Sequence, residues 1–406
     1  MQIFQNTETA FRLKTNKELR KASALFRLMS YPLLVGLSGK LANVAIHLNI
    51  PLRWIVKPTI FSHFCGGETI EECRNVIDRL SKFKVESVLD FAAENQESDD
   101  QIESVMHEIK RTMKLANETS SVPFTVFKPT AIAPVRFLSA AAQYIPPSPD
   151  DNNKKYSAIS FRESDKEKFR QNIRDLCQSA YEKRIPVMID AEESYLQDIV
   201  DSLVMEMMEL YNKEKAIVFN TLQMYRHDRL DFLRDCINIA KEKKYHLGLK
   251  LVRGAYMEQE RERALKMGYP SPIYPDKQST DKAFNLAIEI CLENINRINL
   301  FAGTHNEESL LLLMNLMKSK KIRKNNTRVY VSQLYGMSDH ISFNMAAHSF
   351  NVAKYLPYGP VRYLIPYLIR RAEENKSVTG QAGRELHFIK REIKRRKTSK
   401  NKKDGN

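Results

Sequence analysis

The feature that most constrains this chain is a strand-then-helix alternation that repeats along most of its length. Eight short apolar runs, rich in β-branched and aromatic residues, are each followed by polar residues and then by a helical pattern. The runs are Val85–Phe91, Phe124–Phe127, Val187–Ile189, Ala216–Asn220, Leu247–Val252, Leu300–Gly303, Val329–Gln333 and Asn351–Tyr355. Helical crossovers between strands predict parallel pairing, so we expect a (βα)8 barrel of the TIM type. An open doubly wound sheet is the alternative, and no Gly-rich phosphate-binding turn follows the first run to support it.

The alternation does not reach either end of the chain. Residues 1–84 show helical periodicity in Lys14–Tyr31 and Leu33–Leu48, which predicts a helical arm or cap in front of a barrel at 85–385. Residues 386–406 carry nine Lys or Arg against two acids, and we expect a basic, disordered tail. The tail is either a solvated end or a site of attraction to anionic lipid or nucleic acid.

Cysteine usage and hydropathy restrict the class of protein. The five cysteines are scattered without paired spacing, which argues against a disulfide framework or a zinc site and favours a reducing compartment. The start of the chain lacks the pattern of a signal peptide, and the apolar stretch Leu25–Leu48 is interrupted by Arg27 and Lys40. We therefore expect a cytoplasmic protein, with peripheral contact to the inner face of a membrane through the tail.

Polar residues stand at the ends of seven of the eight apolar runs. A parallel barrel places these ends at one mouth, where its chemistry occurs. A single Lys or Asp there is more often part of a rim ion pair, but seven such ends together favour a site. Donors that are cationic or neutral outnumber carboxylates, which suits an anionic cofactor and a carboxylate substrate and fits a metal poorly. The residues are Lys128, Asp190, Gln223, Lys250, Arg253, Thr304, His305, Gln333 and Tyr355.

A helix after the last run adds two adjacent guanidiniums. Tyr358-Gly359-Pro360 predicts a turn into a helix, and Pro366 predicts a kink or a restart within it. Arg370-Arg371 then stands beside an apolar stripe, with Glu374 one turn later. Paired guanidiniums favour an anion between them, such as a substrate carboxylate. A solvated helix end with an ordinary ion pair is the alternative.

In their order, the motifs resemble those of the proline dehydrogenase (proline oxidase) family, the FAD-dependent barrel enzymes. The likeness covers roughly residues 85–378 and is closest to the single-function, eukaryotic-like branch. The matching segments are Phe127-Lys-Pro-Thr130, Ile189-Asp-Ala-Glu-Glu193, Asn220-Thr-Leu-Gln-Met-Tyr225, Lys250-Leu-Val-Arg-Gly-Ala-Tyr256, Thr304-His-Asn306 and Leu368-Ile-Arg-Arg-Ala-Glu-Glu-Asn375.

The resemblance implies a distorted barrel that holds FAD non-covalently and oxidises L-proline to 1-pyrroline-5-carboxylate. Hydride would pass to flavin N5, and a quinone would take the electrons. Catalytic roles fall to Asp190, which orients Lys128, and to Lys250 beside N5. Substrate binding falls to Lys128, Tyr355, Arg370 and Arg371. Cofactor contacts fall to Ala191, Gln223, Val252, Arg253, Gly254, Ala255, Tyr256, Lys277, Thr304, His305, Gln333 and Glu374.

This chain departs from the family pattern at two charged positions. Many members have Arg where this chain has Lys250, and Lys where it has Arg253, so a forked donor becomes a point charge beside the flavin. Tyr355 favours proline over hydroxyproline, which remains the alternative substrate. Two other readings stay open. One is a Schiff-base barrel lyase that uses Lys128 or Lys250. The other is a binding protein that acts through its tail, although we expect no nucleic acid partner.

Overall fold

The computed structural model describes residues 2–29, 31, 53–94, 96, 98–143, 162–377 and 381–403. Side chains are described within these ranges except at 2, 373–377, 381–382 and 400–403. The helical periodicity expected at Leu33–Leu48 therefore lies outside the described residues, as does the side chain of Glu374.

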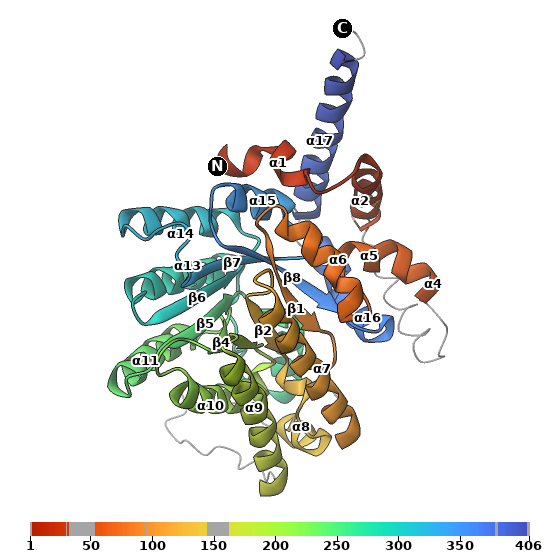
Figure 1. The fold of residues 1–406 in the computed structure, drawn as a ribbon. Coiled ribbons are helices and arrows are strands. Elements are labelled where there is room, and N and C mark those ends of the chain that lie inside the picture. The colour runs from red at the N-terminus through yellow and green to blue at the C-terminus, as the bar shows by residue number, and fades with distance from the viewer. Residues whose placement is uncertain are drawn as a thin grey trace. The chain divides into compact units, whose positions relative to one another are not determined.

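Eight parallel strands close into a barrel in chain order, from β1 round to β8 (Figure 1). The strands are β1 (Glu86–Phe91), β2 (Phe124–Phe127), β3 (Val187–Ile189), β4 (Val218–Gln223), β5 (Leu247–Val252), β6 (Ile298–Gly303), β7 (Val329–Leu334) and β8 (Val352–Tyr358). The predicted (βα)8 barrel is confirmed and the open doubly wound sheet is wrong. The strands β4 and β8 each end three residues later than predicted, at Gln223 and Tyr358, because these residues still pair with neighbouring strands.

Helices lie between the strands, as the amphipathic stretches predict. They are α7 (Asp99–Glu118), α8 (Val135–Ala141), α9 (Glu163–Lys183), α10 (Ser194–Tyr211), α11 (Arg229–Glu242), α12 (Met257–Met267), α13 (Lys277–Glu293), α14 (Glu307–Ser319) and α15 (Asp339–Ala347). Short polar side chains start several of them. Ser98 caps α7, Asp276 caps α13 and Asn306 caps α14, each by accepting a backbone N–H of the first turn.

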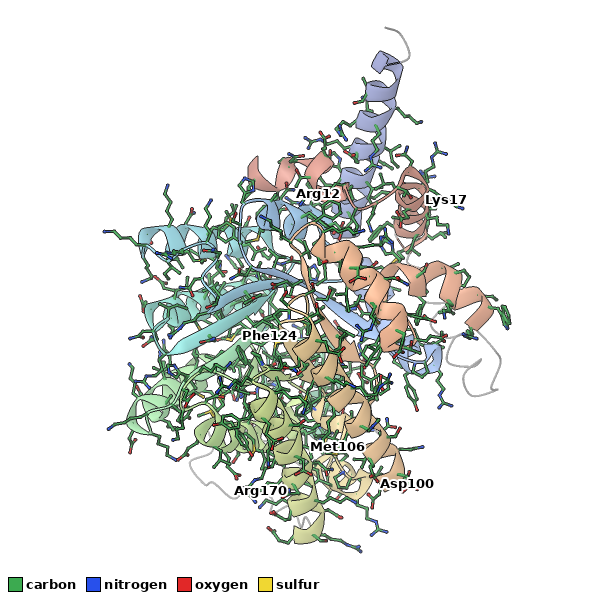
Figure 2. The ribbon with its side chains drawn as sticks, in the orientation of Figure 1. Arg12, Lys17, Asp100, Met106, Phe124 and Arg170 are labelled. Carbon is green, nitrogen blue, oxygen red and sulfur yellow. The ribbon has the colours of Figure 1, made fainter. Side chains whose placement is uncertain are left out.

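Contacts divide the chain into two compact units. The central unit is Ala93–Val331, and the terminal unit combines Met1–Ala92 with Ser332–Asn406. Phe124, labelled in Figure 2, shows how the central unit fills the barrel: its ring packs edge-on against Phe219, Phe301 and Tyr330. Gly248 on β5 leaves room for this packing, because a Cβ there would lie 2.5 Å from the ring of Phe219.

The terminal unit joins both ends of the chain around one apolar core. Its elements outside the barrel strands and α15 are η1 (Gln2–Gln5), α1 (Thr7–Phe11), α2 (Asn16–Met29), α4 (Arg53–Val56), η2 (Lys57–Phe61), α5 (Ser62–Phe64), α6 (Ile70–Ser81), α16 (Val361–Ser377) and α17 (Gln381–Lys403). Buried side chains from four parts of the sequence meet there, including Phe26, Phe61, Leu364 and Phe388. The N-terminal arm is thus part of a core that also contains C-terminal residues.

One expectation about the C-terminal region needs correction, and another is narrowed from a kink or restart to a kink. The expected disordered tail from residue 386 is wrong for residues 386–403, which lie in helix α17. Phe388 and Ile389 explain the helix, since both are buried in the apolar core of the terminal unit. Pro366 causes no restart and lies inside the single helix α16. Among the described residues, no helix is both long and apolar enough to cross a bilayer.

Candidate active site

The central unit places the predicted polar residues on consecutive strand ends. Lys128 directly follows β2, Asp190 follows β3, Gln223 ends β4, Arg253 follows β5 and Thr304 follows β6. In a parallel barrel these positions share the end where loops build active sites. Their locations match the expectation, and their catalytic and binding roles stay predictions.

A buried ion pair joins the ends of β3 and β5. Lys250 Nζ lies 2.6 Å from Asp190 Oδ1, and their side chains are 8% and 16% exposed. Lys250 is an interior residue of β5, while Asp190 begins the turn into α10. The sequence predicted both residues as catalytic but did not predict that they pair. Burial of the pair strengthens its attraction relative to a pair in water.

Glu192 connects four strand ends and was not among the predicted site residues. Its Oε1 accepts bonds from Thr130 N at 3.3 Å and Thr130 Oγ1 at 2.8 Å, and its Oε2 accepts one from the Tyr256 hydroxyl at 3.0 Å. Its backbone carbonyl accepts a bond from Gln223 Nε2 at 3.1 Å. Burial, and then the nearby negative charge of Glu94, raise the pKa of Glu192 to about 7.

Ser194 and Glu260 form a third contact between the residues that follow β3 and the residues that follow β5. Glu260 of α12 is fully buried and accepts bonds from the Ser194 backbone N–H at 2.6 Å and hydroxyl at 2.7 Å. Three residues at alternate positions, Asp190, Glu192 and Ser194, therefore each bond to the segment 250–260, which runs from β5 into α12. Sequence reasoning missed this arrangement because the three acceptors and donors are 60 to 66 residues from their partners.

Two polar atoms of β4 stay unpaired inside the central unit. Gln223 Oε1 and Thr221 Oγ1 are buried and have no hydrogen-bond partner among the described residues. Their residues are two positions apart on one strand, so their side chains lie on the same face. Unpaired buried acceptors and hydroxyls are costly, and they point to a ligand that supplies the missing bonds.

Arg253 uses its guanidinium to connect elements after β5 and β6. Nε lies 2.6 Å from Asp281 Oδ1, Nη1 donates to Thr304 Oγ1 at 2.6 Å, and Nη2 donates to Ser309 Oγ at 2.9 Å. The guanidinium carbon also lies 4.4 Å from the centroid of the Phe284 ring. Burial lowers the pKa of Arg253 from its ordinary value, although Asp281 opposes that shift. Arg253 is therefore held rigidly in place.

The other predicted cofactor residues of the central unit differ in exposure. Lys277 is exposed and pairs with Asp281, Ala255 is exposed, and Ala191 is buried. Gly254 has a φ of +131°, which favours glycine, and a Cβ there would lie 2.5 Å from the Tyr225 ring. The contact of Gly254 with a flavin stays a prediction, and its close neighbour in the structure is Tyr225. Val252, Tyr256 and His305 are half-buried.

The remaining predicted residues belong to the terminal unit. Gln333 on β7 is buried, and its Oε1 accepts a bond from Ser342 Oγ at 2.7 Å. Tyr355 on β8 is 8% exposed and lies opposite Val88 of β1. Arg371 of α16 is 7% exposed, with its guanidinium carbon 5.2 Å from the Tyr367 ring centroid, and Arg370 is half-buried. A buried guanidinium in α16 argues against the alternative of a fully solvated helix end.

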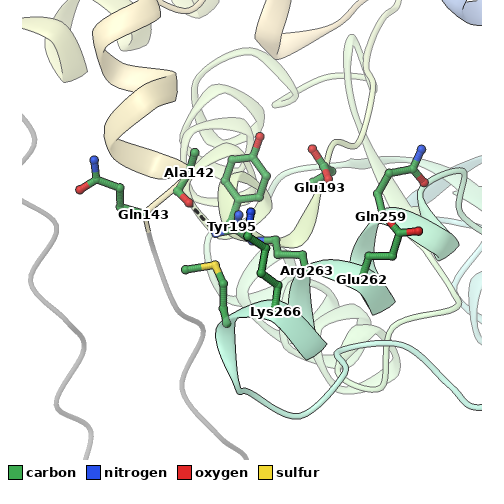
Figure 3. A pocket seen from close by; sticks show the side chains of 9 residues that line it. Ala142, Gln143, Glu193, Tyr195, Gln259, Glu262, Arg263 and Lys266 are labelled. Atoms are coloured by element: carbon green, nitrogen blue, oxygen red, sulfur yellow. Dashed lines mark hydrogen bonds between the residues drawn. The ribbon is translucent and has the colours of Figure 1, made fainter.

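A cavity of about 610 Å³ lies beside the start of α10 (Figure 3). Arg263 stands over the Tyr195 ring, 4.5 Å from its centroid, and donates to the Ala142 carbonyl at 2.7 Å. Burial, followed by the charge of Glu260, raises the pKa of Glu193 in its lining. Within the described residues no cluster of His, Cys, Asp and Glu could hold a metal ion.

Comparison with known proteins identifies the family. The family model described as "Proline dehydrogenase" matches residues 73–384. Proline dehydrogenase 1, mitochondrial, from Dictyostelium discoideum is 32% identical, over 96% of this chain and 74% of that protein. Hydroxyproline dehydrogenase from Xenopus laevis is 31% identical, over 95% of this chain and 88% of that protein.

The fold has a counterpart among solved structures. The crystal structure of proline utilization A from Bdellovibrio bacteriovorus, inactivated by N-propargylglycine, aligns with a TM-score of 0.69 at 19% identity. The alignment covers 93% of this chain and 37% of that chain, so this chain spans about a third of that protein. At this identity the likeness supports the fold alone. The family match and the relatives above 30% identity show that this chain belongs to the proline dehydrogenase family of oxidoreductases.

Proposed function

We propose that this protein oxidises L-proline to 1-pyrroline-5-carboxylate with FAD as its cofactor. The observation that carries the proposal is the position of the family's motif residues. Lys128, Asp190, Gln223, Arg253 and Thr304 stand at five consecutive strand ends of a closed barrel, inside the range that the family model matches.

The residues of the central unit fit a flavin. Gln223 Oε1 and Thr221 Oγ1 are buried without partners among the described residues. A ring N–H of a flavin could donate to Gln223 Oε1, and the Thr221 hydroxyl could donate to a ring oxygen or nitrogen. Lys250, Lys277, Thr304 and the N-terminus of α13 add donors for an anionic cofactor. When bound, the flavin supplies a hydride acceptor for the substrate carbon that carries the nitrogen.

The protein's own groups would position and stabilise the reactants. Lys250 places a buried cation near the strand ends, where negative charge develops during reduction, and Asp190 at 2.6 Å fixes its direction. Lys128, Arg370 and Arg371 are assigned to the substrate carboxylate by the family resemblance, and Tyr355 to its ring. Binding the carboxylate at a fixed point determines which carbon faces the cofactor.

The electrons need an acceptor, and we propose a quinone. A quinone resides in a membrane, so the protein would act in the cytoplasm at the periphery of a bilayer. The exposed basic residues of α17, such as Lys390, Arg391 and Lys394, supply a surface that attracts anionic lipid. Vesicle flotation with anionic and neutral lipids tests this part independently of proline oxidation.

The visible spectrum of the purified protein tests the central proposal. A flavin spectrum that bleaches on addition of L-proline is expected. A colourless protein, or one trapped on a carbonyl substrate by borohydride, would instead support a Schiff-base lyase that uses Lys128 or Lys250.

Substitution of the clamp arginines tests the site. Arg370→Met and Arg371→Met should each raise the KM for L-proline about 100-fold, because each removes a charge-assisted hydrogen bond of about 3 kcal/mol. Flavin content should stay at the wild-type level. Unchanged KM values for both variants would contradict the clamp. Exposed Arg323→Met is the matched control.

Hydroxyproline is the second candidate substrate, supported by the identity to the Xenopus laevis hydroxyproline dehydrogenase. Tyr355 favours proline, since a bulky side chain restricts the space for a ring hydroxyl. The ratio of kcat/KM for L-proline to that for 4-hydroxy-L-proline should exceed one, and Tyr355→Ser should lower it. A ratio below one in the wild type would reverse the assignment of substrate.

A further inference from the structure

Glu192 stands out among the buried acids of the central unit because its contacts come from separate loops. Thr130 binds it from the loop after β2, and Tyr256 binds it from the loop after β5. Its own carbonyl holds Gln223 at the end of β4, and its backbone N–H donates to Gln197 Oε1 of α10 at 2.8 Å. With 5% of the residue exposed, this carboxyl group is screened little by solvent.

We propose that Glu192 is a positioning residue for substrate oxidation, which acts by holding the Tyr256 ring in place through the bond to its hydroxyl. The inference rests on the proposed function, in which the Arg253–Tyr256 loop lies against the cofactor. Tyr256 directly precedes α12, so the same bond attaches the start of that helix to Glu192. Thr130 fixes the other oxygen, so the carboxylate plane has a single orientation.

The hydrogen-bond pattern fits the charged form of Glu192. Three donors point at its two oxygens: Thr130 N, Thr130 Oγ1 and the Tyr256 hydroxyl. A protonated carboxyl has a hydrogen of its own to donate, and its oxygens accept these bonds less strongly than those of a carboxylate. Loss of the charge therefore weakens the bond to Tyr256, since hydrogen bonds to a carboxylate are stronger than those to a neutral acid.

The surroundings of Glu192 place its ionisation near neutral pH. Glu94 faces Glu192 from the loop after β1 and opposes its charge, whereas Lys128 faces it from the loop after β2 and favours it. Tyr195 of α10 and Tyr256 are the other titratable groups in reach. Burial outweighs the favourable contacts, and the pKa of Glu192 rises to about 7. The bond to Tyr256 should accordingly strengthen as the pH rises through 7.

The experiment compares kcat/KM for L-proline in wild type and in five variants from pH 5.5 to pH 9. Titration of the substrate amine is common to all proteins and cancels in the ratio of variant to wild type. Glu192→Gln keeps the side-chain volume but cannot ionise, so its ratio should be near one at pH 5.5. At pH 9 the ratio should fall about tenfold, the value of one charge-assisted hydrogen bond. Glu258→Gln, on the exposed surface of α12, is the matched control and should keep a ratio near one throughout.

Thr130→Val provides a second, independent variant. Removing the hydroxyl takes one donor from the carboxylate, so the pH at which kcat/KM rises should move upward while the plateau is retained. Tyr256→Phe should remove the dependence on Glu192, so that adding Glu192→Gln changes nothing further. A ratio for Glu192→Gln that is constant from pH 5.5 to pH 9 would overturn the proposal. If Glu192→Gln does not fold, an unmoved profile in Thr130→Val does the same.

The proposed function can fail separately from this inference. A wild-type protein that shows no flavin bleaching with L-proline refutes the function. A wild type that bleaches, but whose Glu192→Gln ratio does not depend on pH, refutes only the role of Glu192. Flavin content, from the visible absorbance of each variant, separates lost positioning from lost cofactor.

Discussion

Two buried carboxylates, one in each unit, show how the partners of a buried charge decide its ionisation. In the terminal unit, Asp339 lies between two cations, 2.9 Å from Lys354 Nζ and 3.2 Å from Lys14 Nζ. In the central unit, Glu192 accepts bonds from neutral donors, namely Thr130 and the Tyr256 hydroxyl. Burial opposes the charge at both sites. The lysines nevertheless hold the pKa of Asp339 below its ordinary value, whereas the pKa of Glu192 rises to about 7.

The contrast separates a structural charge from one that is able to titrate. Asp339 stays ionised over the working pH range and connects the N-terminal arm, through Lys14, to β8, through Lys354. Burial works against the charge of Lys14 as well, but Asp339 raises the pKa of Lys14. At Glu192 the nearby charge of Lys128 does not outweigh burial, so this group changes charge near neutrality. A buried carboxylate with cationic partners therefore stays ionised and contributes to stability, whereas one with neutral hydrogen-bond donors can titrate near neutral pH.

The largest expected effect comes from removing the carboxylate of Asp339 from its ion pairs with Lys354 and Lys14. Asp339→Ala should lower the free energy of unfolding by about 3–5 kcal/mol, because it leaves Lys354 and Lys14 buried without their partner. Urea denaturation followed by circular dichroism measures the change. Glu293→Gln, which breaks an exposed pair with Lys320, is the control and should cost less than about 1 kcal/mol. Equal effects of the two substitutions would show that the buried pairs of Asp339 contribute no more than an exposed pair.

The dependence of stability on pH should have opposite signs for the two acids. Because the folded protein binds the Glu192 proton more tightly than the unfolded chain, stability from this group falls as pH rises from 4.5 towards 7. The loss is about 3 kcal/mol at 1.36 kcal/mol per pH unit. The Asp339 contribution is instead present above its ordinary pKa of 3.8 and is lost as pH falls below it.

Glu192→Gln isolates the contribution of Glu192 to the dependence of unfolding free energy on pH. Unfolding free energies of wild type and variant should diverge between pH 4.5 and pH 7 and run parallel above pH 8, since glutamine cannot titrate. Parallel profiles over the whole range would show that Glu192 titrates at its ordinary value. The measurement needs neither substrate nor cofactor, so it stands apart from any assay of proline oxidation.

Arg253 tests how much a guanidinium with several partners contributes to the stability of the central unit. Arg253→Met removes bonds to Asp281, Thr304 and Ser309, and should cost about 2 kcal/mol of unfolding free energy. Arg253→Lys should cost less, because an ammonium keeps the attraction to Asp281. A loss under 0.5 kcal/mol for Arg253→Met would show that its contacts contribute nothing net.

The smallest expected effect concerns the contact between α10 and α12. Ser194→Ala removes the hydroxyl that donates to Glu260 and leaves the backbone N–H, so it should cost about 1 kcal/mol. Thermal unfolding measured against wild type checks this value. A loss as large as that of Asp339→Ala would mean that Glu260 belongs with the structural charges.

Particular residues show where sequence reasoning succeeds and where it stops. The ends of β2, β3 and β5 were predicted correctly, because β-branched and aromatic runs bounded by polar residues are local features. The end of β4 was placed three residues early, at Asn220, because polar Thr221 and Gln223 interrupt the apolar pattern although both are buried. Basic composition predicted disorder in the C-terminal region, but Phe388 and Ile389 anchor α17 in a core.

In the candidate site, the motifs predicted individual residues but not the contacts between them. Motifs predicted Asp190 and Lys250, but not that they form an ion pair, and gave Glu192 no role. Polar residues at the alternate positions 190, 192 and 194 were a local pattern that could have drawn attention to Glu192. Its partners Thr130 and Tyr256 are 62 and 64 residues away, and no local pattern specifies such pairs.

By itself the sequence determined the alternation of strands and helices, the closed barrel that follows from it, and the family to which the chain belongs. These depend on the order and periodicity of residues, which the chain carries locally. Only the tertiary structure decided which buried charges meet cations and which meet neutral donors, and that both termini share one core. Ionisation depends on burial and on neighbours distant in sequence, so the difference between Asp339 and Glu192 exists only once the chain has folded.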